Sequence, residues 1–344
     1  MFNVYASVLK NKFIAAKICS MNTPNIAELI NKQYQLGLLL AYLHGKNYRF
    51  TTISPVSHKL VNSRVSNVMA IGLAGIFGWN RPFSVEIIDD LMFDLIQTAN
   101  IAIKVKDGRI KDCWISQFRV SSINHQLFLH SAYPTLNNDA VFFGPDTYRF
   151  ANAIQRYLSS NQHGIHRAID IGTGSGAGAV LLASALPESE IIAVDINDDA
   201  LCLARINIDA AAIKNITLIN SNLLSNVKGN FDLIIANPPY LLDEPERAYR
   251  HGGGQLGAAL SLEVVDTAIA RLNVGGTLLL YTGVAIVNGY DAFLAEVKVK
   301  LTSAEFSFEY VEIDPDIFGE ELASDAYSTI DRIAAVVLTA RKQS

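Results

Sequence analysis

The residues with the clearest chemistry are Asn237, Pro238, Pro239 and Tyr240, which follow a short, largely apolar run at 231–236. Such a run, bounded by turn residues, is typical of a buried strand. Proline lacks a backbone N–H and has a fixed φ, so the two prolines predict a stiff turn without competing donors. The Asn237 side-chain oxygen and the Pro238 carbonyl can then accept both hydrogens of a planar amino group. The Tyr240 ring offers a flat face on which an amide or a base can stack.

A second motif, residues 168–183, reads as a strand, a glycine-rich turn and a helix. Gly172, Gly174 and Gly176 permit positive φ, so a ligand can lie over the turn at the helix N-terminus. A phosphate-binding P-loop is excluded, because it needs Lys and Ser or Thr where Gly178-Ala179 stands. Two ligands stay open. One is a dinucleotide, whose fingerprint Gly174-x-Gly176-x-x-Ala179 nominally satisfies, and the other is S-adenosylmethionine.

Of the polar residues near the ends of the first three strands, Asp170 favours S-adenosylmethionine, whereas Asp195 supports a nucleoside without distinguishing the two ligands. Asp170, two residues before the first glycine, would repel a pyrophosphate but hold the ammonium of a methionine moiety. Asp195 stands nineteen residues after Gly176, at the position from which an acid reaches a ribose diol. Ile196 can cover one face of an adenine, and Asn222 places an amide where its amino edge should lie.

The elements that position these motifs begin near residue 143, where strand-like and helical segments alternate. This alternation predicts a doubly wound α/β sheet, with the motifs at the carboxyl ends of the strands, where ligands bind in such folds. The last two strands have no helix between them and predict an antiparallel pair that closes the sheet. The predicted strands are 166–171, 190–196, 215–220, 231–237, 275–283, 305–313 and 331–340.

The first 140 residues have a different pattern. Apolar spacing predicts helices over about 25–43, 56–76 and 84–99, the last with Ser84 as N-cap. Alternating residues on both sides of Asp107-Gly108 predict a hairpin. Three helices and a hairpin suggest a winged-helix-like domain, so we expect a flexible extension at 1–20, a winged-helix-like substrate or partner domain at 21–140 and a catalytic domain at 141–344.

Charge and composition limit the function further. The 344 residues have a net charge of −5, but residues 1–140 carry 14 Lys and Arg against 8 Asp and Glu. A basic front half favours an anionic partner, such as nucleic acid or an acidic protein face, although the cations are dispersed as on any solvated surface. No apolar segment reaches the roughly 18 residues of a membrane span. Three scattered cysteines suggest reduced thiols in the cytoplasm, and the pair His163-x-x-His166 lacks a third ligand, so we expect no metal site.

Taken together, the motifs DIGTGSG, VDIN and NPPY resemble those of the class I S-adenosylmethionine-dependent methyltransferases that methylate amino nitrogens. Protein glutamine N5-methyltransferases that modify release factors are similar, as are rRNA guanine and adenine amino-methyltransferases. The resemblance covers roughly residues 140–344 and implies a Rossmann-like seven-stranded sheet with an antiparallel last strand. The first 140 residues do not resemble the helical substrate domain of the release-factor enzymes.

The resemblance also implies roles for individual residues. The segment 141–151 resembles the one that closes over the cofactor, and the loop 249–261 resembles a glycine-containing segment that touches substrate. Asn237, Pro238 and Tyr240 would hold the target nitrogen. Asn222 departs from the Asp that is common in the family. The implied contacts to S-adenosylmethionine come from Thr147, Asp170, Gly172, Thr173, Gly174, Gly176, Asp195, Ile196, Asn222, Leu223 and Asn237.

Three functions are compatible with the sequence. The first is methyl transfer from S-adenosylmethionine to a planar amino nitrogen of a macromolecule, either a glutamine side chain or a nucleic-acid base. The second is a small-molecule N- or O-methyltransferase in which the front domain is a lid or a dimer surface. The third is a cofactor-binding module without activity, which the intact NPPY motif disfavours. In-line methyl transfer needs mostly positioning, with no catalytic carboxylate or metal.

Overall fold

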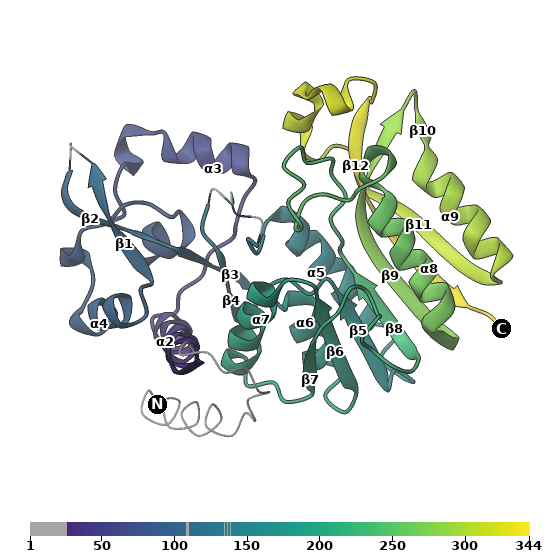
Figure 1. Ribbon diagram of the computed structural model, residues 1–344, viewed down its shortest axis with the longest axis horizontal. Coiled ribbons are helices and arrows are strands. Elements are labelled where there is room, and N and C mark those ends of the chain that lie inside the picture. Colours follow the sequence, from purple (N-terminus) through teal and green to yellow (C-terminus); the bar gives the residue numbers. More distant parts are fainter. Residues whose placement is uncertain (1–25, 108–109, 134, 136, 138) are drawn as a thin grey trace. The chain divides into compact units, whose positions relative to one another are not determined.

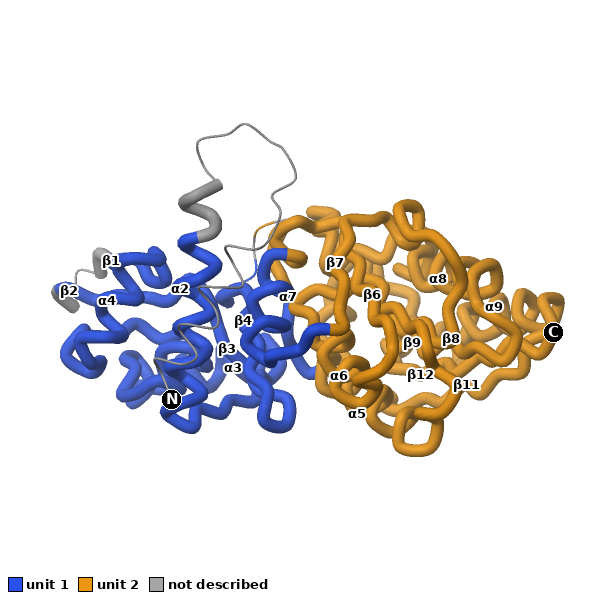
Figure 2. Tube along the Cα trace, turned by 90° about the horizontal axis from the view of Figure 1, so that it is seen from below, with its two compact units in different colours: residues 1–136, 142–145, 202–214 blue, residues 137–141, 146–201, 215–344 orange. Residues whose placement is uncertain are grey.

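The structure of the protein is a computed structural model that describes residues 26–107, 110–133, 135, 137 and 139–344. The described chain divides into two compact units, shown in Figure 2. The N-terminal unit contains the described residues before 137 together with 142–145 and 202–214, and the sheet unit contains the rest. The predicted extension at 1–20 lies outside the described residues. The functional division into a partner domain and a catalytic domain stays a prediction.

One large sheet organises the sheet unit, with its strands in the order β11–β12–β9–β8–β5–β6–β7 and a two-residue strand, β10, paired with β9. The neighbours from β7 to β9 are parallel, whereas β12 runs antiparallel to both β9 and β11. The predicted α/β fold with a parallel-rich sheet is therefore confirmed. The strands are β5 (Arg167–Ile171), β6 (Glu190–Asp195), β7 (Ile216–Asn220), β8 (Phe231–Ala236), β9 (Leu272–Val287), β10 (Tyr290–Asp291), β11 (Phe306–Asp314) and β12 (Arg332–Lys342).

Helices cover the sheet because its central strands are apolar on both faces. Alternate residues of a strand point to opposite faces, so Ile169 and Ile171 of β5 enter the core that α8 and α9 cover, and Asp170 faces the other side. Figure 1 shows α8 and α9 along the half of the sheet that contains β9 and β11. The helices of this region are α5 (Pro145–Leu158), α6 (Ala177–Ala185), α7 (Asp198–Ala210), α8 (Ala259–Arg271) and α9 (Ala292–Ser303), with 3₁₀ turns η4 (Gln255–Gly257), η5 (Gly319–Ala323) and η6 (Asp325–Tyr327).

The N-terminal unit combines helices with two hairpins. The hairpin of β1 and β2 is the predicted one, and α2 packs beside α4 and β4. Asn207 of α7 bonds to both backbone groups of Leu129 in β4, at 2.8 and 3.0 Å. The winged-helix interpretation stays a prediction. The elements are α2 (Ile26–Gly45), α3 (Pro55–Asn62), η1 (Val65–Asn67), the π-helical turn η2 (Ala74–Gly78), η3 (Val85–Ile87), α4 (Asp90–Thr98), β1 (Ala102–Asp107), β2 (Ile110–Ser116), β3 (Phe118–Ile123) and β4 (Gln126–Ser131).

Two predicted helices of this unit are shorter than expected. The helix predicted over 56–76 ends at Asn62, where the Asn67 side chain donates to the Val61 carbonyl at 2.7 Å and Arg64 turns extended. The helix predicted from Ser84 begins at Asp90. Ser84 caps only the short turn η3, and the extended backbone of Ile88 separates this turn from α4.

The hairpin of β3 and β4 was not predicted. Its two strands pair from Phe118 with Ser131 to Ile123 with Gln126. The turn between them uses Asn124 at φ +53°, a left-handed conformation that Asn tolerates better than most residues. No helix among the described residues is long and apolar enough to cross a membrane.

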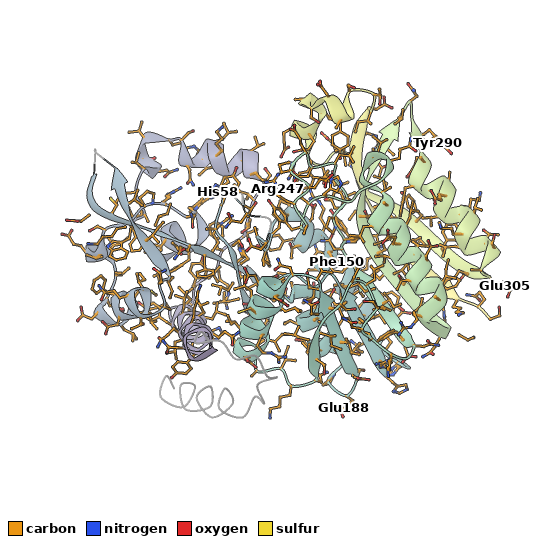
Figure 3. All side chains as sticks on the ribbon, in the orientation of Figure 1. His58, Phe150, Glu188, Arg247, Tyr290 and Glu305 are labelled. Carbon is orange, nitrogen blue, oxygen red and sulfur yellow. The ribbon has the colours of Figure 1, made fainter. Side chains whose placement is uncertain are left out.

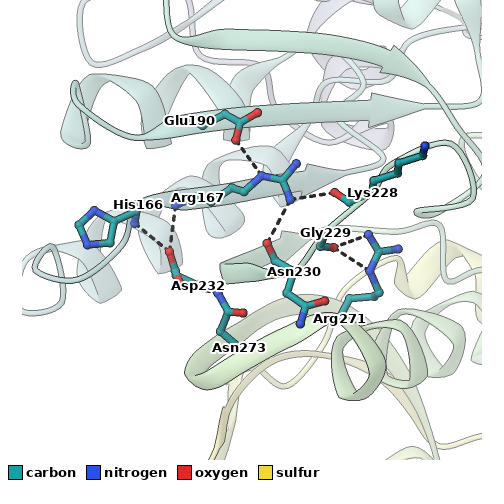
Figure 4. A network of polar contacts seen from close by, with 9 residues as sticks. All are labelled: His166, Arg167, Glu190, Lys228, Gly229, Asn230, Asp232, Arg271 and Asn273. Atoms are coloured by element: carbon teal, nitrogen blue, oxygen red, sulfur yellow. Dashed lines mark hydrogen bonds and ion pairs between the residues drawn. The ribbon is translucent and has the colours of Figure 1, made fainter.

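The amino-terminal edge of the sheet is closed by a polar network, shown in Figure 4. The Asp232 carboxylate accepts from the backbone N–H groups of His166 and Arg167 at 2.9 and 3.0 Å and from the Asn273 side chain at 2.8 Å. The Arg167 guanidinium pairs with Glu190 at 2.7 Å and donates to the Lys228 carbonyl at 2.9 Å. These contacts join the starts of β5, β6 and β8 at the edge opposite the predicted site.

Candidate functional site

The strand register brings the predicted motifs to one edge of the sheet. Ile171, the last residue of β5, pairs with Val194 of β6 on one side and with Ala236 of β8 on the other. Asp195 pairs with Asn220 at the end of β7. The glycine turn, Ile196, the segment 221–223 and Asn237 therefore all leave the sheet at neighbouring carboxyl ends, where adjacent strands lie about 5 Å apart.

The glycine turn has the backbone that the sequence predicts. Gly172, Gly174 and Gly176 have φ of +70°, +53° and +81°, and α6 starts directly afterwards. The turn is fixed to the next strand, because the N–H groups of Gly172 and Thr173 both donate to the Val194 carbonyl at 2.9 Å. A Cβ added at Gly172 or Gly174 would meet no atom within 4 Å. The space over the turn is thus open for a ligand, as a bound S-adenosylmethionine requires.

Asp170 lies beneath the turn rather than over it. The residue is 1% exposed, and one carboxylate oxygen accepts from the Thr173 hydroxyl at 2.6 Å and from the Ala179 N–H at 2.9 Å. Burial raises the pKa of Asp170 to about 6, against the opposing effect of these two donors. Asp170 and Thr173 therefore hold the turn to the start of α6, and any effect of Asp170 on a ligand acts through this buried position.

The predicted ribose and adenine residues lie side by side at the ends of β6 and β7. Asp195 is half-buried and accepts from the Gly174 and Asn197 N–H groups at 2.9 and 3.0 Å. Burial raises the pKa of Asp195, although these backbone donors lower it. Ile196 is 57% exposed, which is unusual for a large aliphatic residue and fits a wall for a flat ring. Asn222 is exposed, and Leu223 beside it is half-buried with φ +48°.

The corner after β8 places Asn237 next to the glycine turn, because Ala236 pairs with Ile171 immediately before Gly172. Asn237 is half-buried and Pro238 is buried. Within the part of the chain that the structure describes, the Asn237 side-chain amide has no hydrogen-bond partner. A half-buried amide at the mouth of the sheet can form hydrogen bonds with a ligand that has a planar amino group.

Tyr240 faces inward, which limits the stacking face that the sequence suggested. The residue is 7% exposed, and its ring lies edge-on to the rings of Tyr281 and Phe318, with centroids 6.5 and 6.1 Å apart. Its hydroxyl donates to the buried carboxylate of Asp146. Burial, together with the charge of Asp146, raises the pKa of Tyr240 well above its usual value.

Asp146 is a residue that the sequence reasoning missed. It lies in the first turn of α5, directly before the predicted cofactor contact Thr147, which is half-buried. The only available signal was its place in Gly144-Pro145-Asp146-Thr147, inside the segment that resembles the cofactor-closing region of the family. Its partner Tyr240 is 94 positions away, so the spacing along the chain could not reveal the contact.

The glycine-containing loop after β8 packs on the NPPY corner. The Gly252 N–H donates to the Leu241 carbonyl at 2.8 Å, and the Leu241 N–H donates to the Arg250 carbonyl at 3.1 Å. A Cβ on Gly252 would lie 2.8 Å from the Pro239 carbonyl oxygen. Asp243, which is 6% exposed, forms ion pairs with Arg247, labelled in Figure 3, and with Arg250. Backbone hydrogen bonds and side-chain ion pairs therefore both hold the loop against the corner.

No group of three or more metal-ligating side chains occurs among the residues that the structure describes. At the carboxyl edge, the backbone of the glycine turn instead lies next to the Asp195 carboxylate, the exposed Ile196 side chain and the Asn237 amide. Such an edge can hold a nucleoside with a charged tail and present a planar amino group beside it.

Comparisons with known proteins agree with this geometry. Residues 151–297 match the family described as the methyltransferase small domain. A ribosomal protein uL3 glutamine methyltransferase of Neisseria gonorrhoeae is 36% identical over 132 residues, which cover 35% of this chain and 44% of that protein. A release factor glutamine methyltransferase of Escherichia coli is 41% identical over 107 residues, covering 31% and 38%. A solved ribosomal protein L11 methylase of Lactobacillus delbrueckii has a TM-score of 0.41 at 21% identity, covering 59% of this chain and 81% of that one.

The matched residues 151–297 contain the glycine turn, Asp195 and the NPPY corner, whose motifs resemble those of the class I S-adenosylmethionine-dependent methyltransferases. Within this class, the two curated relatives named above carry the name glutamine methyltransferase. S-adenosylmethionine is the cofactor of that class. The chain spans less than half the length of the first curated relatives that it matches.

Proposed function

We propose that this protein transfers a methyl group from S-adenosylmethionine to the side-chain amide nitrogen of a glutamine in a protein substrate. The observation that carries the proposal is the position of the half-buried Asn237 amide, directly beside the glycine turn at the carboxyl edge of the sheet. The names of the two relatives above, which act on a ribosomal protein and on a release factor, favour a protein glutamine over a base or a metabolite.

The chemistry required of this chain is mostly positioning. The Asn237 side-chain oxygen and the Pro238 carbonyl accept the two N–H bonds of the target amide, which fixes its plane and exposes one face of the nitrogen. The prolines add no donor that would compete for these oxygens. When bound, S-adenosylmethionine would supply the methyl group and leave as S-adenosylhomocysteine: the S–CH3 bond breaks as the N–CH3 bond forms, and the proton that the amide nitrogen loses passes to solvent.

We expect the N-terminal unit to bind the protein substrate. The described part of its sequence from Lys32 to Arg81 contains no Asp or Glu, whereas it contains six Lys and Arg residues. Lys46 pairs with Asp89 at 3.3 Å, and the other five cations would attract an acidic segment of a partner at low salt. We also propose that the winged-helix-like interpretation applies to this unit and that the reaction takes place in the cytoplasm, with release factors and ribosomal proteins as the substrate class to test first.

The test is a transfer assay with labelled S-adenosylmethionine. Purified protein is incubated with a lysate, which is then separated into protein, nucleic-acid and small-molecule fractions. We expect the label in the protein fraction, and peptide mass spectrometry should place a 14-Da addition on a glutamine side chain. Label confined to nucleic acid or to small molecules would contradict the proposed substrate class.

A matched pair of variants tests the site itself. Asn237→Ala should lower turnover by about two to three orders of magnitude, the usual cost of removing a group that orients a reacting atom, while cofactor affinity stays nearly unchanged. Asn230→Ala, an exposed asparagine directly before β8 at the opposite edge of the sheet, should leave both quantities unchanged. If Asn237→Ala instead abolishes cofactor binding and keeps turnover per bound cofactor, Asn237 does not hold the target amide.

A further inference from the structure

Asp146 is a buried carboxylate for which the proposed reaction supplies no role. The residue is 5% exposed, yet its two oxygens receive three donors. Oδ1 accepts from the Tyr281 hydroxyl at 2.6 Å and from the Arg149 guanidinium at 2.9 Å, and Oδ2 accepts from the Tyr240 hydroxyl. A buried carboxylate with this many donors is well satisfied, so it has one defined position.

The Oδ1 side of Asp146 is fixed without any help from Tyr240. Arg149 makes a second ion pair, with Asp314 at the end of β11 at 2.7 Å, and this pair holds the guanidinium in place. Tyr281 lies within β9, next to the sheet centre, and is fully buried. The first turn of α5 is thereby tied to two strands, and Oδ2 is presented as a fixed acceptor.

The ring of Tyr240 depends on that acceptor. Its face lies so close to Gly283 of β9 that an added Cβ there would be 2.3 Å from Tyr240 Cε2. Its other ring neighbours, Tyr281 and Phe318, make edge-on contacts that do not fix rotation as a hydrogen bond does. The bond to Asp146 places the end of this side chain, with the Tyr281 hydroxyl beside it.

The position of Tyr240 is passed on to the proposed acceptors through a stiff segment. Pro238 and Pro239 separate Tyr240 from Asn237, and both have a φ fixed by the pyrrolidine ring. Because φ is fixed at both prolines, the segment has fewer ways to absorb a shift of Tyr240, and part of the shift reaches the Pro238 carbonyl and the Asn237 side chain. An error of about 1 Å in such a position can lower a rate on the order of a hundredfold.

We propose that Asp146 is a positioning residue for methyl transfer, which holds the Tyr240 hydroxyl and so aims the acceptors of Asn237 and Pro238 at the target nitrogen. The inference rests on the proposed function and names a residue that acts through Tyr240 rather than on the substrate. It also links the first turn of α5, where the predicted cofactor contact Thr147 follows Asp146, to the corner that receives the target amide.

Four variants test the inference: Asp146→Asn, Tyr240→Phe, the double variant, and a control, Tyr310→Phe, which removes a hydroxyl from a different carboxylate, that of Asp291. We expect each of the first two to lower kcat about ten- to hundredfold, with cofactor Kd changed by less than about threefold. The double variant should be no slower than the slower single variant, because both changes break one interaction. Tyr310→Phe should stay within about threefold of the wild type, since its partner Asp291 caps α9 and does not contact the NPPY corner.

A second measurement does not depend on catalysis. Hydrogen exchange of the backbone amides of Tyr240 and Leu241, followed by mass spectrometry, should be faster in Asp146→Asn and in Tyr240→Phe than in the wild type and in Tyr310→Phe. If the wild type transfers no methyl group, the proposed function fails while this exchange pattern still decides the role of Asp146. Additive losses in the double variant, unchanged exchange, or equal effects of Tyr310→Phe and Tyr240→Phe would each overturn the inference. If Asp146→Asn does not fold, Tyr240→Phe is a sufficient test. An unchanged kcat together with unchanged hydrogen exchange in this variant would then overturn the inference.

Discussion

Gly257 lies against the backbone of Tyr240, and a Cβ at this glycine would be 2.1 Å from the Tyr240 carbonyl oxygen. No side chain fits in that space, so the loop can pack on the NPPY corner only with glycine here. Its φ of +83° is also a conformation that L-residues rarely adopt. The loop and the corner are consequently one rigid piece, and the loop is expected to matter for turnover.

Gly257→Ala should therefore lower kcat by more than about tenfold, because the methyl group pushes the loop away from the corner. The matched control is Gly289→Ala, where φ is +73° but an added Cβ meets no atom within 4 Å. Both variants place alanine at a positive φ, but only Gly257→Ala also brings a Cβ against the Tyr240 carbonyl oxygen. Steady-state kinetics with thermal unfolding as a fold check separates them, and equal kcat in both variants would exclude a role for the contact.

Asp170 should make the stability of the sheet unit depend on pH. Its pKa is about 6 in the folded protein against 3.8 for the ordinary carboxyl, so between these values the folded state binds more protons than the unfolded state. The contribution of Asp170 to the free energy of unfolding is then greatest below about pH 4. It falls by up to about 3 kcal/mol as the pH rises through about 6. Urea unfolding without cofactor at pH 4.5 and 6.5 measures the change.

The Asp170→Asn variant should lack this contribution, because an amide oxygen can accept from Thr173 and Ala179 without carrying a charge. The difference in unfolding free energy between the variant and the wild type should therefore grow as the pH rises. Asp325→Asn, at an exposed position, serves as the control and should follow the wild type at every pH. A pH-independent difference for Asp170→Asn would show that the carboxyl is not protonated in the fold.

His58 gives the N-terminal unit a pH dependence of the opposite sign. The imidazole is 4% exposed and packs on the rings of Trp79 and Tyr133. Burial, with the charge of Arg119, lowers the pKa of His58 from 6.5 to about 4. The unfolded state binds more protons between these values, so this stability is present above about pH 6.5 and is lost as the pH falls toward 4.

We expect His58→Phe to remove most of that acid sensitivity, because phenylalanine keeps a ring against Trp79 and has no proton to bind. Near-ultraviolet circular dichroism of the tryptophan signal from pH 7 to pH 4 follows the unit directly. His163→Gln, at an exposed position before β5, should leave the acid transition where it is in the wild type. An unchanged transition in His58→Phe would assign the acid sensitivity to other groups.

The sheet could be predicted from the sequence because its strands are buried on both faces and read as apolar runs between helices. The order of the motifs then placed Asp195, Asn222 and Asn237 at one edge without further information. The hairpin of β3 and β4 could not be found in the same way, because Arg119, Ser121 and Ser122 interrupt its apolar pattern. Those polar side chains are satisfied by partners far away in the chain, such as the Gly78 carbonyl for Arg119 at 2.7 Å.

The orientation of the site residues was harder to predict than their place. Asp170 follows Ile169 and precedes Ile171, so it points away from the core they enter, toward Gly178 of α6. A Cβ at Gly178 would lie 2.8 Å from its carboxylate, which shows how closely helix and strand approach. The inward turn of Tyr240 depends on Asp146 in α5, and contacts of this kind become visible only once the fold has brought the segments together.

Asp232 should stabilise the sheet without affecting catalysis, because it lies at the edge opposite the site. Burial raises its pKa, but the donors from Asn273, His166 and Arg167 outweigh that effect and lower it. The stability that Asp232 contributes is therefore present above the ordinary carboxyl pKa and is lost as the pH falls through its lowered value.

Asp232→Ala leaves two backbone N–H groups without their acceptor and should cost about 1–3 kcal/mol at pH 7. Asp266→Ala, which removes only an exposed pair with Lys300, should cost less than about 1 kcal/mol. Urea unfolding gives both values, and kcat measured well below the unfolding midpoint should be unchanged in both variants; a large loss of kcat in Asp232→Ala would mean that the two edges of the sheet are coupled.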